Sequence, residues 1–154
     1  MIQWIDRSRK GRKDMMVSTK GRYALRVMLD LAQHADGSNI SLSDIAKRQQ
    51  ISVKYLEAVM ASLNKGGMVI SKMGKKGGYR LAKSPNEYTV GEILRLIEGK
   101  LAPVACLKEE ENRCERASGC LTLPMWQEVE NLMTDYFNQI TLEHLLHGDV
   151  KRNG

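Results

Sequence analysis

Two short helical segments joined by a tight turn constrain the fold of this chain more than any other feature of its sequence. The first begins with Ser41 and Asp44, which resemble a capping box. After a turn at residues 51–52, the second carries apolar residues at helical spacing and ends at a pair of glycines. The apolar residues are Val53, Leu56, Val59, Met60 and Leu63. This arrangement predicts a helix-turn-helix.

A glycine-rich hairpin follows directly. Residues 68–71 and 79–82 predict two short strands, and Gly74-Lys75-Lys76-Gly77-Gly78 predicts the turn between them. A lysine-bearing hairpin after a helix-turn-helix is typical of the wing of a winged helix, where glycines permit the turn and lysines meet phosphate. We therefore expect a mainly α fold with a small β-hairpin wing.

Helical signals lie on both sides of this unit. Ser18 or Thr19 can cap a preceding helix, and Thr89 with Glu92 forms a capping pair for a helix over residues 90–98. The expected organisation has five parts. These are a basic, disordered arm (1–14), the winged helix-turn-helix (15–88), a linking helix with a cysteine loop (89–121), a long dimerisation helix with a short terminal helix (122–147), and a tail (148–154).

The long helix begins near Pro124, which suits a first helical turn. Its apolar residues recur at spacings of three and four, the pattern of helices that pair side by side. They are Trp126, Val129, Met133, Tyr136 and Ile140. A helix lying on its own domain would show the same pattern. We expect a two-fold homodimer, because helix-turn-helix proteins commonly read two half-sites.

Charge is distributed unevenly along the chain. Residues 1–88 carry 17 Lys and Arg against 7 Asp and Glu, whereas residues 89–154 carry 7 against 11. The basic half suits a polyanion, because released counterions drive binding to nucleic-acid phosphates; a solvated basic surface would have the same composition. The sequence shows no apolar run long enough for a membrane span and no secretory signal, so we expect a cytoplasmic protein without a membrane partner.

Three cysteines, Cys106, Cys114 and Cys120, lie within 15 residues of one another. Their odd number and the missing signal argue against a disulfide framework. Thiolates are soft ligands that suit iron–sulfur clusters, zinc or copper(I), and nearby basic residues would stabilise them. A cluster-free thiol switch and three unconnected thiols are the alternatives.

Several residues are candidates for contacts with double-stranded DNA. On the second helix of the helix-turn-helix they are Ser52, Lys54, Tyr55 and Glu57, and on the wing they are Lys72, Lys75 and Lys76. Glu57 can accept a hydrogen bond from cytosine in the major groove, which serves discrimination more than affinity. Ser18 and Thr19 can donate to phosphate at a helix N-terminus, although a simple cap would use the same residues.

Four segments resemble the IscR-type regulators (the Rrf-two family), and the resemblance spans residues 15–147. They are STKGRYALRVMLDLA, ISVKYLEAVMASLNKGGMV, GKKGGYRLAKSP, and CLTLPMW with ITLEHLL. The resemblance implies a dimeric winged-helix transcription factor, typically a repressor. It also implies an iron–sulfur cluster, 2Fe-2S or 4Fe-4S, on the three cysteines, and we favour 2Fe-2S.

The sequence departs from the family pattern at three positions. Leu123 replaces a ligating histidine, Arg22 replaces a ligating aspartate, and Met73 replaces an arginine of the wing. The fourth cluster ligand therefore stays unassigned. The seven-residue gap between Cys106 and Cys114 is similar to that of the iron-responsive branch.

The function expected from the sequence is a DNA-binding regulator, a repressor, whose operator affinity is controlled by the cluster. The alternative is a cluster-free winged-helix regulator controlled by a partner protein or a thiol switch. An enzyme or an electron carrier is not expected, because the chain shows no nucleophile motif, no phosphate loop and no room for a substrate domain.

Overall fold

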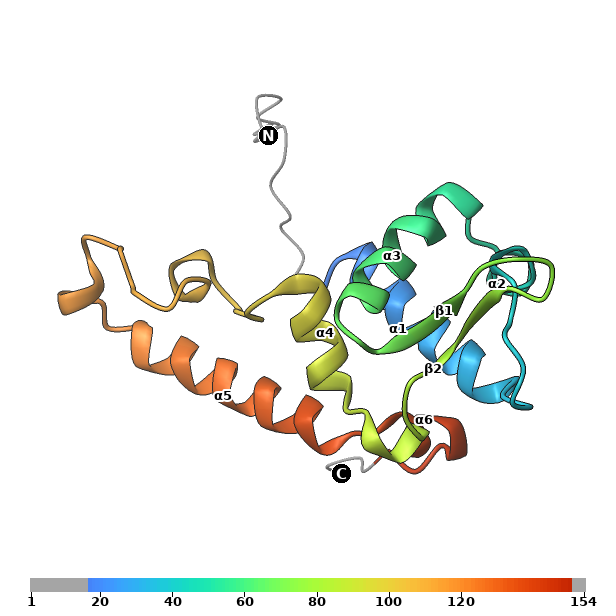
Figure 1. Ribbon diagram of the computed structural model, residues 1–154. Helices are drawn as coiled ribbons and strands as arrows, with labels where there is room; N and C mark the ends of the chain where they lie inside the picture. The colour runs from blue at the N-terminus through green and yellow to red at the C-terminus, as the bar shows by residue number, and fades with distance from the viewer. Residues whose placement is uncertain (1–16, 151–154) are drawn as a thin grey trace, which may run out of the picture.

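The computed structural model describes residues 17–150, so the predicted basic arm, residues 1–14, lies outside the described residues. The described part contains six α-helices and one two-stranded sheet (Figure 1). None of these helices is long and apolar enough to cross a membrane. The helices and strands are α1 Thr19–Gln33, α2 Leu42–Gln49, α3 Val53–Lys65, β1 Val69–Lys72, β2 Gly78–Leu81, α4 Val90–Glu98, α5 Leu123–Gln139 and α6 Leu142–His147.

Polar caps begin the helices where the sequence predicts them. The hydroxyls of Ser41, Ser52 and Thr89 each accept a hydrogen bond from the backbone N–H three residues on. The predicted box at Ser41 differs in detail, because the Ser41 hydroxyl donates to the Asp44 carboxylate at 2.7 Å. Aspartate is one methylene shorter than the glutamate of a full capping box. The caps therefore set where α2, α3 and α4 start.

The wing is an antiparallel hairpin of β1 and β2. Val69 pairs with Leu81 and Lys72 with Gly78, which shifts each strand by one residue from its predicted range. The hairpin is anchored to the segment before α2, because the backbone N–H and carbonyl groups of Ile40 and Tyr79 exchange two hydrogen bonds of 2.8 Å. The helix-turn-helix and the wing therefore form one unit.

The main core lies between α1, α2 and α3 and continues across residue 88, where the sequence suggests a boundary. Tyr88, Ile93 of α4 and Leu142 of α6 belong to the same buried cluster as the helix-turn-helix. The backbone N–H of Val90 donates to the carbonyl of Ile140 at 2.8 Å, which brings the chain after α5 back beside the start of α4. The C-terminal segment thus completes the winged domain.

Helix α5 extends away from this core. Figure 1 shows it running from the cysteine loop, residues 99–121, at one end of the molecule to α6, which lies beneath the winged domain. The cysteine loop contains two short 3-10 turns, Ala105–Leu107 and Ala117–Gly119. The three cysteines therefore lie far along the chain from the helix-turn-helix but directly between α4 and α5.

Candidate nucleic-acid interface and cysteine loop

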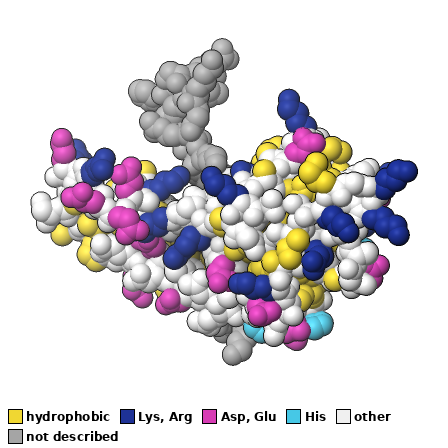
Figure 2. Space-filling view, in the orientation of Figure 1, with side chains coloured by type: hydrophobic (Ala, Val, Ile, Leu, Met, Phe, Trp, Pro, Cys, Tyr) yellow, Lys and Arg dark blue, Asp and Glu magenta, His cyan; other side chains and the backbone are white. Residues whose placement is uncertain are grey.

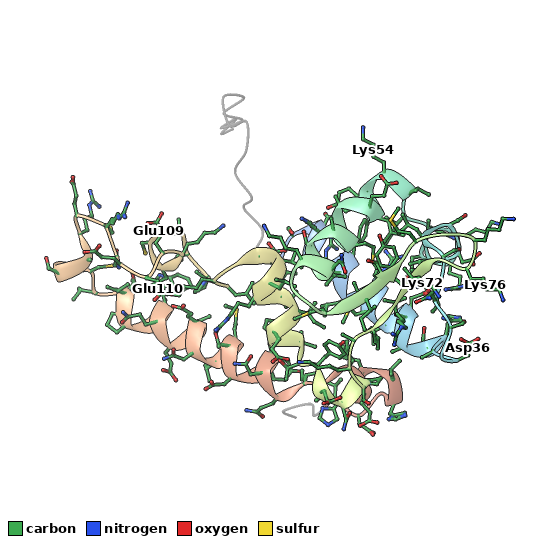
Figure 3. All side chains as sticks on the ribbon, viewed as in Figure 1. Asp36, Lys54, Lys72, Lys76, Glu109 and Glu110 are labelled. Carbon is green, nitrogen blue, oxygen red and sulfur yellow. The ribbon has the colours of Figure 1, made fainter. Side chains whose placement is uncertain are left out.

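The N-terminal end of α3 presents the predicted DNA-contacting residues together. Ser52, Lys54, Tyr55 and Glu57 are all exposed there. Figure 3 shows Lys54 projecting from this end of α3, away from the rest of the molecule. The buried residues of α3, such as Leu56 and Met60, face the opposite way into the core. This leaves the polar N-terminal end of α3, with one lysine and one glutamate, exposed to solvent.

Helix α1 contributes two side chains to this surface that the sequence pattern did not identify. The ring of Tyr23 packs edge-on against Tyr55, with 5.4 Å between centroids. The Arg26 guanidinium lies over Tyr23, 5.1 Å from its centroid, and donates to the side-chain oxygen of Gln49 at 3.2 Å. In the sequence, the only indication of these contacts was that Tyr23 and Arg26 lie outside the apolar stripe of α1. The contacts fix the orientation of Tyr55 at the start of α3.

A buried carboxylate fixes α2 against α1. Asp30 has no exposed surface and accepts hydrogen bonds from Arg48 at 2.7 and 3.0 Å and from Gln49 at 2.8 Å. Burial alone would raise the pKa of Asp30, but the hydrogen bonds from Arg48 and Gln49 outweigh it and hold the pKa below 3.8. The charged network therefore sets the position of α2, and through the turn that of α3.

The wing carries its three predicted lysines on an exposed hairpin. Lys72 ends β1, and Lys75 and Lys76 lie in the turn. The N–H of Gly77 donates to the carbonyl of Gly74 at 2.9 Å and closes the turn. Gly78 has φ +145°, and a Cβ there would collide with the backbone of Ile40. Glycine at position 78 is therefore required for the wing to approach the segment before α2.

The prediction that Ser18 donates to phosphate requires correction. Ser18 is buried, and both its backbone N–H, at 2.9 Å, and its hydroxyl donate to one carboxylate oxygen of Glu98. Its hydroxyl oxygen accepts from Gly21 as a helix cap at 3.2 Å. Glu98 is the last residue of α4, far away in sequence, so no local signal revealed the contact. Thr19 stays a candidate, with its hydroxyl 3.4 Å from Arg22.

The surface charge follows the division seen in the sequence. Figure 2 shows Lys and Arg side chains over the helix-turn-helix and the wing, and Asp and Glu side chains concentrated over the cysteine loop and α5. A few basic side chains lie among the acidic ones, including Arg113, which pairs with Glu109 at 3.6 Å. The exposed basic side chains of the helix-turn-helix and the wing therefore make this face of the winged domain suited to a polyanion.

The cysteine loop holds its three thiols in an open arrangement. Cys106 is partly buried in the first 3-10 turn, Cys114 is exposed, and Cys120 ends the second turn. Within residues 17–150, no three His, Cys, Asp or Glu side chains are close enough to hold a metal ion. The donor set of three thiolates fits an iron–sulfur cluster in its chemistry. Ligation by all three would require the loop to close.

The thiol of Cys120 lies beside the hydroxyl of Thr122. Its sulfur lies 3.4 Å from the Thr122 hydroxyl, and hydrogen bonding by Thr122 lowers the pKa of the Cys120 thiol. A larger thiolate fraction favours both metal ligation and oxidation. Cys106 differs, because it lines a pocket of about 420 Å³ between the loop and α5.

Among residues 17–150, the structure does not identify a fourth cluster ligand beside the three cysteines. Glu109, Glu110 and Glu111 are exposed in the loop (Glu109 and Glu110 are labelled in Figure 3). His144 and His147 lie on α6, beyond the far end of α5, whose 17 residues span about 25 Å. His34, beside Asp30, follows α1. The histidines of the same chain are thus separated from the cysteine loop.

Helix α5 has an exposed apolar stripe that overlaps the predicted seam. Trp126, Val129 and Met133 are half-buried, and Tyr136 is exposed. Ile140 is different: it is 8% exposed and packs with Val90 and Leu94 of α4. It therefore serves mainly the core of its own chain. The seam pattern did not include Met125 and Leu132, which are 51% and 61% exposed and continue the stripe at helical spacing.

Comparison with known proteins identifies the fold and the class of regulator. The model of the Rrf2 family, described as iron-dependent transcriptional regulators, matches residues 17–148. The HTH-type transcriptional regulator IscR of Pectobacterium carotovorum is 38% identical over 133 residues, which cover 86% of this chain and 80% of that protein.

Two solved structures have the same architecture. The T. potens IscR structure is 36% identical with a TM-score of 0.69, and the match covers 90% of this chain and 93% of that one. The structure of CymR (YrzC), the global cysteine regulator of B. subtilis, is 33% identical with a TM-score of 0.70, covering 86% of this chain and 96% of that one. The predicted fold, mainly α with a β-hairpin wing, is thereby confirmed. The chain belongs to the Rrf2 family of winged-helix transcriptional regulators.

Proposed function

We propose that this chain is a homodimeric repressor whose affinity for a double-stranded DNA operator is controlled by an iron–sulfur cluster on Cys106, Cys114 and Cys120, with 2Fe-2S favoured. The observation that carries the proposal is the position of the cysteine loop. It directly joins α4, which packs on α1 of the winged domain, to α5, which presents an exposed apolar stripe. A change in the loop would act on both parts.

The winged domain supplies the DNA contacts. The N-terminal end of α3 enters the major groove, as the second helix of a helix-turn-helix does. Lys54 and Tyr55 reach phosphates or base edges, and Glu57 accepts from cytosine. Lys72, Lys75 and Lys76 of the wing contact the phosphate backbone, which positions the protein without reading sequence. Tyr23 packs against the ring of Tyr55, and Arg26 lies over Tyr23, so the two residues hold Tyr55 in its orientation.

The stripe on α5 supplies the contact between two chains. Val129, Leu132 and Tyr136 lie on one face of the helix and expose apolar surface that a second copy would bury. A two-fold pair of α5 helices would hold two α3 helices at a set separation. Because half-sites on DNA lie about one helical turn apart, a small change in that separation weakens both contacts together.

The cysteine loop supplies the control. An iron–sulfur cluster would tie the three thiolates to one another and make the loop's conformation depend on iron, cluster supply and oxidants. Because the thiols are open in this structure, ligation would be coupled to closure of the loop. Lys108, Arg113 and Arg116 on the loop would offset the negative charge. The IscR name of two relatives and the family's description as iron-dependent support this assignment.

A cluster-free thiol switch or control by a partner protein is the second candidate. It is favoured by two observations: Leu123 occupies the position of a ligating histidine, and the lowered pKa of Cys120 favours its oxidation. Among the structural relatives, one is a global cysteine regulator and another is an oxidised form of the Staphylococcus aureus protein of the same name.

The test compares operator binding by cluster-loaded protein, cluster-free protein and the variants Cys106→Ala, Cys114→Ala and Cys120→Ala at one salt concentration. Iron and sulfide are assayed after anaerobic purification. We expect a brown protein, at least a tenfold difference in Kd (about 1.4 kcal/mol) between loaded and free forms, and cluster-free behaviour from each variant. Ser118→Ala in the same loop is the control and should behave as wild type.

Equal affinities of loaded and free protein, with the cluster verified, would show that the cluster does not control DNA binding. A colourless protein whose affinity changes on thiol oxidation, and not in Cys120→Ala, would support the thiol switch instead.

A further inference from the structure

The tip of the wing carries an apolar side chain that neither the fold nor the phosphate contacts explain. Met73 is 93% exposed and follows Lys72 directly, at the point where β1 ends. Single exposed apolar side chains are common on protein surfaces. This one differs in its position, because it lies at the end of a cationic hairpin built to meet DNA.

The geometry of the hairpin fixes where Met73 is presented. The pairing of Lys72 with Gly78 is the last of the ladder, so residues 73–77 form the tip. The Gly77 to Gly74 hydrogen bond closes the turn, and Gly74 has φ +104°. Figure 3 shows Lys72 and Lys76 on the part of the hairpin that extends furthest from α4 and α5. The tip is thus a short, closed turn rather than a loose loop.

The lysines around Met73 direct it toward a groove. If α3 enters the major groove as proposed, the adjacent wing would lie over the neighbouring backbone and minor groove. Lys72, Lys75 and Lys76 would bind phosphates on the groove's edges, because they are exposed point charges without apolar surface at their ends. The uncharged thioether of Met73, which lies between these lysines in the sequence, has no electrostatic attraction to phosphate. The surface that suits it is the apolar face of a base, which a side chain reaches from the minor groove by entering between two base pairs.

We propose that Met73 is a wedge that enters the minor groove of the operator and partly unstacks one base step, so that the wing reads the deformability of the DNA. This inference rests on the proposed DNA binding and adds a specificity residue to it. Methionine is among the side chains that unstack base steps in minor-groove complexes, and unstacking bends the duplex. Pyrimidine–purine steps are the easiest to unstack. The operator should therefore contain such a step where each wing lies.

The experiment uses the full chain and an operator duplex recovered by selection from a random-sequence library. Wild type is compared with Met73→Ala, Met73→Leu and Lys75→Ala, by Kd at several salt concentrations and by energy transfer between dyes on the two duplex ends. Because Met73 is almost fully exposed, neither substitution should affect folding, and circular dichroism checks this.

We expect Met73→Ala to weaken operator binding about tenfold, to reduce the bend, and to leave the salt dependence unchanged. Met73→Leu should retain the bend and bind within about twofold of wild type, because leucine is also a wedge residue. Lys75→Ala should instead make the salt dependence shallower. Replacing the pyrimidine–purine steps under the wing should weaken wild type but not Met73→Ala.

The wedge is refuted if wild type binds the operator without bending it, or if Met73→Ala binds and bends it as wild type does. If the selection recovers no duplex at all, DNA binding itself fails and the wedge fails with it. If only the difference between loaded and free protein is absent, the cluster proposal fails and the wedge stands.

Discussion

The ion pair between Asp30 and Arg48 should show an asymmetry when each partner is removed. Arg48→Ala leaves a fully buried carboxylate with one donor, Gln49, whereas Asp30→Ala leaves a guanidinium whose side chain is already 34% exposed. Removing one partner of a buried pair costs about 3–5 kcal/mol because the other charge stays buried. We expect this range for Arg48→Ala and about 2–3 kcal/mol for Asp30→Ala, since Arg48 can turn to water.

The assay is urea unfolding followed by circular dichroism at pH 7. Lys47→Ala, the neighbouring exposed position of α2, is the control and should change the free energy of unfolding by less than about 0.5 kcal/mol. A larger loss for Asp30→Ala than for Arg48→Ala would contradict the burial argument. Losses below about 1 kcal/mol in both would show that the pair does not hold α2 in place.

The same pair predicts a pH dependence. A carboxyl whose pKa is lowered on folding stabilises the fold above its unfolded pKa, and this contribution is lost as the pH falls through the lower folded value. The pKa of Asp30 is lowered from 3.8. The advantage of wild type over Asp30→Asn in unfolding free energy should therefore be full near pH 7 and shrink below about pH 4. A constant difference over that range would exclude Asp30 as the titrating group.

Three further predictions concern the wing, the α5 stripe and the Ser18 contact. Lys75→Ala with Lys76→Ala should weaken binding to specific and random DNA alike and lower the slope of log K against log salt by about one unit per lost phosphate contact; an unchanged slope would contradict the wing assignment. Val129→Asp with Leu132→Asp should give monomers in sedimentation, because two charges would be buried unpaired, whereas Leu121→Asp, at a position 96% exposed before α5, should stay dimeric. Glu98→Ala should lower the free energy of unfolding by about 2 kcal/mol by removing the acceptor of both Ser18 donors, and Glu98→Gln should lose less because its amide oxygen can still accept. Equal losses for the two Glu98 variants would mean that the negative charge of the carboxylate, and not an acceptor oxygen alone, is what stabilises the contact.

Much of this protein follows from local sequence signals. Caps at Ser41, Ser52 and Thr89 and apolar residues at helical spacing set the helices, because each depends on atoms only three or four residues apart. The glycines of the wing set a hairpin for the same reason. Cys106, Cys114 and Cys120 lie within 15 residues of one another, so this cluster of soft ligands can be recognised without knowledge of the fold.

Contacts between distant segments were decided only by the tertiary structure. Ser18 was predicted to bind phosphate, but its donors serve Glu98, 80 residues away. Ile140 shares the spacing of the α5 seam, yet it packs on α4 because the chain turns back after Gln139. Tyr23 packs on Tyr55 at the start of α3 because α1 lies beside α3. Periodicity assigns a residue to a face of its helix, but which neighbour covers that face depends on how the helices pack.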